Sequence, residues 1–180
     1  MSGCKLTSNI TKQNCNYSVA GVRALYLYNY DSANTYTPNQ ATSAITAITL
    51  AEGAKAYKVD FIDSTASFTD DLAEGGNGGK YRTHTLNFSI NKYDYDLLNQ
   101  GDALSLGRFT AVVVDKAGRA VVLGRLNGLS ATSFNYASGA ADADANGWTV
   151  VMAGTEVEIG RLLEDEEVIK SIADATAVTP

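Results

Sequence analysis

Only a few residues in the sequence have types and spacing that could do chemistry, and the single histidine is the first of them. His84 lies between Thr83 and Thr85 in a stretch that alternates like a strand. A catalytic triad would need a serine or cysteine nucleophile beside it, and the Gly-x-Ser-x-Gly pattern of a nucleophile elbow does not occur. A lone histidine is more often structural or surface-exposed than catalytic, and we interpret His84 in that way.

A second candidate is a calcium-loop pattern. Residues 142–147 read Asp-Ala-Asp-Ala-Asn-Gly, which matches the first half of such a loop. The complete loop needs a bidentate glutamate at its twelfth position, where this chain has Ala153. We therefore interpret the run as a turn before Trp148, with Asn146 and Gly147 providing left-handed backbone.

Carboxylates cluster at 70–71, at 94 and 96, and at 164–167. Paired carboxylates can hydrolyse glycosidic bonds. The active sites of glycosidases are usually also lined by several aromatic side chains, however, and this chain has one tryptophan. A solvated acidic face is the better interpretation. The residue types therefore predict a protein that is not an enzyme and that uses no cofactor or metal.

Composition predicts one globular domain, and the charge argues against a protein that binds nucleic acids. Apolar residues make up 45% and charged residues 19%, while ten tyrosines, 16 glycines and only 2 prolines favour strands and turns. The net charge is −6, whereas proteins that grasp nucleic-acid phosphates need a basic footprint. DNA could pass such a surface without sticking. We expect no signal peptide and no membrane span.

The two cysteines, Cys4 and Cys15, are too few for a disulfide framework. We expect free thiols in a reducing compartment, and a bridge between them stays open.

The elements that must position these residues are mostly strands. We predict a mainly β fold, an antiparallel β-sandwich or barrel with one short flanking helix and extended terminal arms. The domain spans 19–163, with an N-terminal arm at 1–18 and a C-terminal tail at 164–180. Strands are expected at 19–30, 45–50, 54–62, 80–90, 110–114, 120–123, 129–136 and 147–152, with the second and third of these forming a hairpin around Glu52-Gly53.

Other segments are expected to be loops or helices. Residues 31–43 are rich in turn formers and predict a loop. Residues 93–105 predict a short helix with Asp94 as N-cap and with Tyr95, Leu98 and Leu104 as its buried stripe. The tail could form one amphipathic helix over 165–173. The valine-rich runs around 110–123 predict a hairpin covered on both faces.

Residues 63–79 are predicted to be the most flexible segment. They hold Asp63, Asp70, Asp71 and Glu74, followed by Gly75, Gly76, Asn77, Gly78 and Gly79. A phosphate-binding loop would need Lys-Ser or Lys-Thr after the glycines and then a helix, but here Lys80 begins a strand. A mobile loop is the prediction.

Three arginines, Arg108, Arg119 and Arg125, flank or lie within the central hairpin. They could form ion pairs between subunits, or they could simply keep the strand ends soluble.

Two segments resemble phage tail tube proteins. Residues 80–90 (Lys-Tyr-Arg-Thr-His-Thr-Leu-Asn-Phe-Ser-Ile), a short helix, and 108–128 with Val-Val-Val-Asp-Lys-Ala-Gly at 112–118 resemble the core of that family. Residues 138–151 are similar to its end, where an Asp-Ala-Asn-Gly-aromatic step enters the last strand. The resemblance covers roughly residues 80–155, and its motifs are compositional.

The resemblance implies a β-sandwich or β-barrel with a small flanking helix, whose copies close six at a time into rings that stack into a tube conducting DNA. Partners would be other copies, other virion tail or connector proteins, and DNA as transient non-specific cargo, in a virion made in the host cytoplasm. The four acids at 63, 70, 71 and 74 would then face the lumen or the next ring, and the 75–79 loop would order on stacking.

Two further functions stay open from the sequence. One is another head–tail ring, connector or capsid decoration protein. The other is a non-assembling binding module, such as a carbohydrate-binding β-sandwich. Mass in solution separates assembling from non-assembling proteins.

Overall fold

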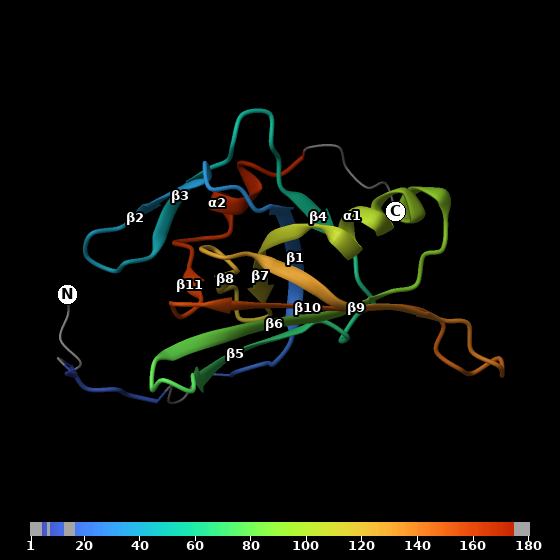
Figure 1. The fold of residues 1–180 in the computed structure, drawn as a ribbon, viewed down its shortest axis with the longest axis horizontal. Coiled ribbons are helices and arrows are strands. Elements are labelled where there is room, and N and C mark those ends of the chain that lie inside the picture. Colours follow the sequence, from blue (N-terminus) through green and yellow to red (C-terminus); the bar gives the residue numbers. More distant parts are fainter. Residues whose placement is uncertain (1–4, 7, 13–16, 175–180) are drawn as a thin grey trace.

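The computed structural model describes residues 5–6, 8–12 and 17–174. The fold is mainly β with antiparallel strands, as predicted (Figure 1). The strands are β1 (Val22–Asn29), β2 (Thr35–Pro38), β3 (Ile45–Thr49), β4 (Tyr57–Val59), β5 (Ser67–Glu74), β6 (Lys80–Ile90), β7 (Arg108–Asp115), β8 (Ala120–Leu123), β9 (Leu129–Ala137), β10 (Gly147–Glu156) and β11 (Arg161–Leu162). The helices are α1 (Tyr95–Leu106) and α2 (Glu167–Lys170).

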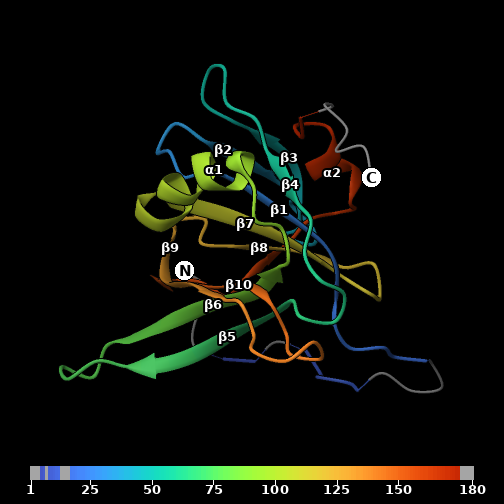
Figure 2. The ribbon, with the colours of Figure 1, turned by 90° about the vertical axis from the view of Figure 1, so that its right-hand side faces the viewer.

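One continuous sheet folds over into two layers (Figure 2). In the first layer β7 pairs with β1 on one side and β8 on the other, while β4 and β11 extend its edges. At its start β7 turns to pair with β9, through Arg108 with Ser130 and Phe109 with Leu129. The second layer continues from β9 through β10 and β6 to β5. Leu25, Val113, Leu86 and Val150 belong to the core shared by the two layers.

The first layer is covered on its other face as well. Val112 and Val114 of β7 belong to a second core with Ile45 of β3 and Ile169 of α2. All four side chains are at most 3% exposed. This double coverage confirms the predicted covered hairpin, and it explains why β7 reads as a continuous apolar run and not as an alternation.

The expected pairing of 45–50 with 54–62 is wrong. A turn does form at Gly53, where Ala54 N–H donates to the Ala51 carbonyl over 2.9 Å. The strands separate after it, because β3 pairs with β2 and β4 pairs with β1. The region 31–43, expected to be a loop, supplies β2. Turn residues show where the chain bends, and the choice of partner depends on apolar faces elsewhere.

The mobile loop predicted at 63–79 is also corrected. Residues 67–74 form β5, which pairs with β6 from Ser67 opposite Asn87 to Glu74 opposite Lys80. The glycines make a closed turn, in which Gly75 N–H donates to the Gly79 carbonyl over 2.7 Å and Gly78 has φ of 78°. Acidic residues depress strand propensity, but Phe68 packs against the core and pins the register.

Helix α1 forms where predicted, and the Asp94 carboxylate caps it by accepting from Leu97 N–H over 3.0 Å. The expected buried stripe is partly wrong, since Tyr95 is 85% and Leu98 43% exposed. Gly101 is buried in their place, and a Cβ there would lie 3.4 Å from Phe134 of β9. Leu104 packs against the core as predicted, and the contact through Gly101 is one that a pattern of large apolar residues cannot reveal.

The ends of the chain differ from one another. Every described residue of the predicted N-terminal arm is exposed, and Cys4 and Cys15 lie outside the described residues. In the C-terminal tail, helix α2 is shorter than the expected 165–173. Ile169 is fully buried and Ala173 bridges to Ala56, so residues 164–174 pack against the domain.

Candidate functional site

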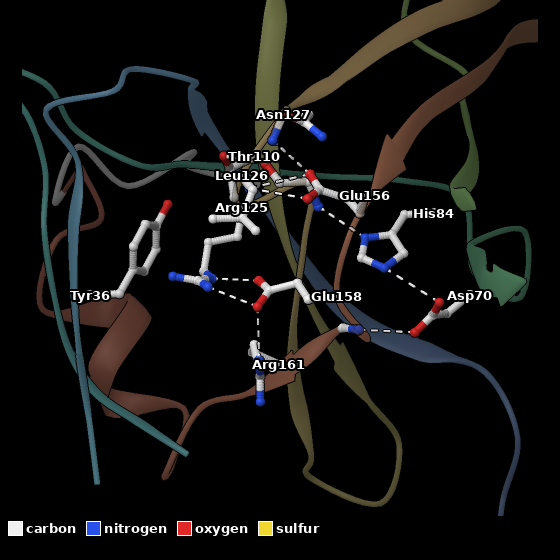
Figure 3. Close-up of polar contacts among 12 residues, drawn as sticks. Tyr36, Asp70, His84, Thr110, Arg125, Leu126, Asn127, Glu156, Glu158 and Arg161 are labelled. Carbon is white, nitrogen blue, oxygen red and sulfur yellow. Dashed lines mark hydrogen bonds and ion pairs between the residues drawn. The ribbon is translucent and has the colours of Figure 1, made fainter. Parts of the chain in front are cut away.

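Polar side chains gather where the β5–β6 hairpin, the link from β8 to β9 and the segment from β10 to β11 meet (Figure 3). Within the described residues, the buried polar side chains are Asn34, His84, Thr110 and Glu156. The last three belong to this region. We call it the polar cluster, and it consists of Asp70, Arg82, His84, Thr110, Arg125, Glu156, Glu158 and Arg161.

His84 accepts a hydrogen bond on one ring nitrogen and faces a carboxylate with the other. Its Nδ1 accepts the N–H of Gly124 over 3.2 Å, so a neutral ring carries its proton on Nε2. Nε2 faces the Asp70 Oδ1 atom at 3.4 Å. No serine, threonine or cysteine bonds to this imidazole in the part of the chain that the structure describes. The ring connects two strands of the fold.

Asp70 ties the same region together from β5. Its carboxylate accepts from Arg82 of β6, and from Gly160 N–H over 2.9 Å. Partial burial alone would raise the pKa of Asp70, but the hydrogen bonds from Arg82 and Gly160 and the nearby His84 outweigh it, so the pKa lies below its usual value.

Glu156 is 1% exposed, and its carboxylate accepts hydrogen bonds from backbone N–H groups. Its Oε1 accepts Asn127 N–H over 2.9 Å, and its two oxygens share Leu126 N–H. Asn127 also donates its side-chain amide to the Thr155 carbonyl over 2.8 Å. These bonds fix the link between β8 and β9 to the end of β10.

Two guanidinium groups share the Glu158 carboxylate. Arg125 donates from Nε and Nη2 to its two oxygens over 2.5 and 2.8 Å, and Arg161 Nε donates over 3.0 Å. Burial alone would raise the pKa of Glu158, whose side chain is 9% exposed, but the two arginines lower it overall. The hydrogen bonds to Glu158 in turn raise the pKa of Arg125.

A cavity of about 240 Å³ opens beside these arginines, between them and the β2–β3 hairpin. Tyr36 forms part of its wall, with the Arg125 guanidinium 5.2 Å from the ring centroid. The Tyr36 hydroxyl lies 3.0 Å from that of Tyr28, and burial raises the pKa of both phenols. The cavity is lined by Tyr36, Pro38, Ser43, Ile45, Arg125 and Arg161, and we call it the arginine pocket.

The four predicted lumen carboxylates do not share one loop. Asp63 is exposed before β5, and Asp70 faces inward and is paired with Arg82. Asp71 and Glu74 are exposed on β5, where Asp71 accepts from the Thr69 hydroxyl over 2.7 Å. The hairpin therefore divides the predicted acidic group between the polar cluster and the surface.

Two of the three arginines predicted to pair between subunits are paired within the chain. Arg119 donates to Asp115 over 2.6 Å, and Arg125 donates to Glu158. Arg108 has no ion pair among residues 5–6, 8–12 and 17–174, and its guanidinium lies 5.8 Å from the Tyr30 ring centroid. Glu156, Glu158 and Arg161 were not singled out from the sequence, although two alternating glutamates directly after a buried strand were a usable signal.

The outward face of the second layer carries almost no charge. His84, Leu86 and Phe88 of β6 point inward, so their neighbours point outward with the residues paired to them on β5, β10 and β9. Neither α1 nor α2 lies on this side (Figure 2). The outward residues, here named the hydroxyl face, are Ser67, Thr69, Asp71, Ala73, Tyr81, Thr83, Thr85, Asn87, Ser89, Thr149, Val151, Ala153, Thr155, Ser130, Ser133 and Asn135.

The described residues lack both a metal-binding cluster and a helix that could span a membrane. Residues 5–6, 8–12 and 17–174 contain no cluster of three or more His, Cys, Asp or Glu side chains arranged to hold a metal ion. In the 142–147 run, Asp144 accepts from Ala140 and Ala141 N–H, both over 2.8 Å, and so closes a turn. Neither of the described helices has the length and apolar character that crossing a bilayer requires.

Comparisons with protein-family models, curated proteins and solved structures found no match to this chain.

Proposed function

We propose that this chain is a structural virion protein, a tail tube subunit that assembles with copies of itself into stacked six-membered rings around a DNA-conducting channel. The observation that carries the proposal is the hydroxyl face, a broad sheet surface without a single lysine or arginine. The resemblance of residues 80–155 to tail tube proteins supports the same function.

A channel wall for DNA must not hold phosphates. Lysine and arginine supply most of the sequence-independent affinity of proteins for DNA, because they bind phosphates and release counterions. The hydroxyl face presents hydroxyl and amide groups with Asp71 as its only charge. We therefore place this face towards the bore, where its waters separate the wall from the passing duplex.

A ring also needs sheet edges that a neighbour can complete. In the described chain β5 pairs only with β6, so the other edge of its eight residues is open. The opposite margins are short, since β4 has three residues and β11 two. A long open edge invites strand addition from another copy, and a repeated end-to-end contact of this kind closes into a ring.

Sedimentation and negative-stain imaging of the purified chain test the function. Rings or tubes with a central channel are expected. A chain that stays monomeric at about 100 µM, a concentration at which contacts with a Kd of about 1 µM would be nearly saturated, contradicts the proposal. If that monomer binds a glycan, it is a binding module, and rings that never stack would indicate a connector or decoration protein.

A further inference from the structure

We propose that the arginine pocket is a socket for a carboxylate, and that its occupant is Asp142 in the β9–β10 loop of a neighbouring copy. The inference rests on the proposed self-assembly and adds a second contact between copies to the one proposed at the β5 edge.

The pocket has hydrogen-bond donors to spare. Arg125 uses Nε and Nη2 on Glu158, and Arg161 uses Nε. Among the described residues no acceptor bonds to Nη1 of Arg125 or to either Nη of Arg161. These free N–H groups can bind a further acceptor, and guanidinium is matched in shape to carboxylate.

The walls of the pocket are already in place. Glu158 fixes both arginines, and Tyr36 covers one side of Arg125. The rim formed by the β2–β3 turn is held by Asn39, whose side chain accepts Ala41 N–H over 2.9 Å and whose carbonyl accepts Ser43 N–H over 2.8 Å. Because these side chains and this turn are already held in place, binding would cost little conformational entropy, which favours affinity.

The proposed occupant is equally well prepared. The loop between β9 and β10 is held by Asp144 through its bonds to Ala140 and Ala141 and through the left-handed Gly139, with φ of 69°. Asp142 is exposed and has no hydrogen bond or ion pair with any residue that the structure describes. The segment 138–146 contains Asp142 and Asp144 but no basic residue, so it offers carboxylate acceptors to the free guanidinium donors of the pocket.

The two features lie at opposite ends of the molecule. Figure 1 shows the β9–β10 loop extending at one end of the long axis, with β2, β3 and β11 towards the other. The loop therefore cannot reach the pocket of its own chain, but it can reach that of the next copy. A contact between unlike surfaces at opposite ends repeats from copy to copy and closes into a ring when the rotation allows.

A double-mutant cycle in the full chain tests the contact. Asp142→Asn and Arg161→Gln are each expected to weaken association on the order of tenfold, as charge-assisted interface bonds do. The double variant should be no weaker than either single one, because both changes remove the same bond. Asp102→Asn, an exposed acid on α1, is the matched control and should leave association unchanged. Additive losses, or no loss, overturn the inference.

Cross-linking supplies a second readout that does not depend on affinity. In a Cys4→Ser, Cys15→Ser background, one chain with Asp142→Cys is mixed with another carrying Ser43→Cys, and a short bismaleimide is added. Linked pairs are expected, whereas Asp102→Cys with Ser43→Cys should give none. Assembled rings without linked pairs contradict this contact alone, and a monomeric unmodified chain contradicts the proposed function itself.

Discussion

At the residue scale, His84 illustrates how a chemically capable side chain can serve to hold a fold. Its Nδ1 accepts the Gly124 N–H, and its Nε2 faces Asp70. A general base needs a ring nitrogen within reach of the proton that it takes. Here both nitrogens already have neighbours in the protein, one from each of two other strands or links.

Replacing His84 with leucine is therefore expected to cost about 2–3 kcal/mol of unfolding free energy, because Gly124 N–H loses its acceptor in a buried place. Urea unfolding measures this loss. Thr85→Ala, on the outward side of the same strand, is the control and should stay within about 0.5 kcal/mol of the unmodified protein. A His84→Leu variant as stable as that control would show that the imidazole does not contribute to the free energy of unfolding.

Glu158 makes stability depend on pH. Its pKa lies below the ordinary 4.5 in the folded protein, so between the folded and ordinary values the unfolded chain binds more protons. The stabilisation is fully present above the ordinary value and is lost as pH falls through the folded value. We expect Glu158→Gln to lose less stability than the unmodified chain when pH drops from about 6 to about 3, measured by thermal unfolding. An equal loss in both proteins would refute this.

At the element scale, two glycines show how the surroundings decide the effect of one methyl group. Gly101 of α1 has room for a Cβ at ordinary contact distance from Phe134. Gly154 of β10 lies so close to Gly128 that a Cβ would come within 2.2 Å of the Gly128 carbonyl oxygen. The first site tolerates a larger side chain, and the second brings two backbones together.

The same substitution should accordingly act in opposite directions. Gly101→Ala is expected to be neutral or to stabilise by up to about 1 kcal/mol through helix propensity. Gly154→Ala should destabilise by about 2 kcal/mol or more, because the obstructing atom belongs to the backbone. Denaturant unfolding of the two variants compares them directly, and equal effects would rule out the close approach at Gly154.

The strength of each element's apolar signal explains what the sequence could predict. The runs at 110–114 and 120–123 are apolar apart from Thr110, because both faces of that layer are buried, and their covered position can be predicted from this pattern. Residues 67–74 contain three acids and only two large apolar residues, and their strand is specified by Phe68 and by the partner β6. Pairing of β3 with β2 likewise depends on contacts that local patterns do not contain.

The polar cluster was harder to predict than the strands. Asp70 and Arg125 stood out as charged residues near glycines or strand ends, yet their partners Arg82 and Glu158 come from other segments. Single-sequence patterns give charge and spacing but not which side chains become buried together. The burial of Glu156 depends on two N–H groups from the β8–β9 link.

At the scale of the whole molecule, the distribution of charge matters more than its total. The chain carries a net charge of −6, but the hydroxyl face holds only Asp71. The absence of lysine and arginine from this face, and not a strong negative field, is what would keep DNA mobile.

Placing lysines on this face should reverse that property. A Thr83→Lys, Thr85→Lys variant is expected to retain double-stranded DNA at low salt and to release it near about 0.2 M salt, as phosphate contacts do. The control puts two lysines on the exposed side of α1, at Asn99 and Gln100. Binding by fluorescence anisotropy on assembled material measures the difference. Equal retention by both variants would place the hydroxyl face outside the channel.

The position of β1 in the chain has a consequence for synthesis. Val22 near the beginning pairs with Asp115, and Asn29 pairs with Phe109. While a ribosome is still making the intervening residues, β1 lacks its main pairing partner, since only the short β4 can pair with it earlier. The nascent polypeptide therefore passes through a partly folded, aggregation-prone intermediate. Slow translation before residue 115 should favour aggregation of the nascent chain in the cell, and holdase chaperones should suppress this aggregation.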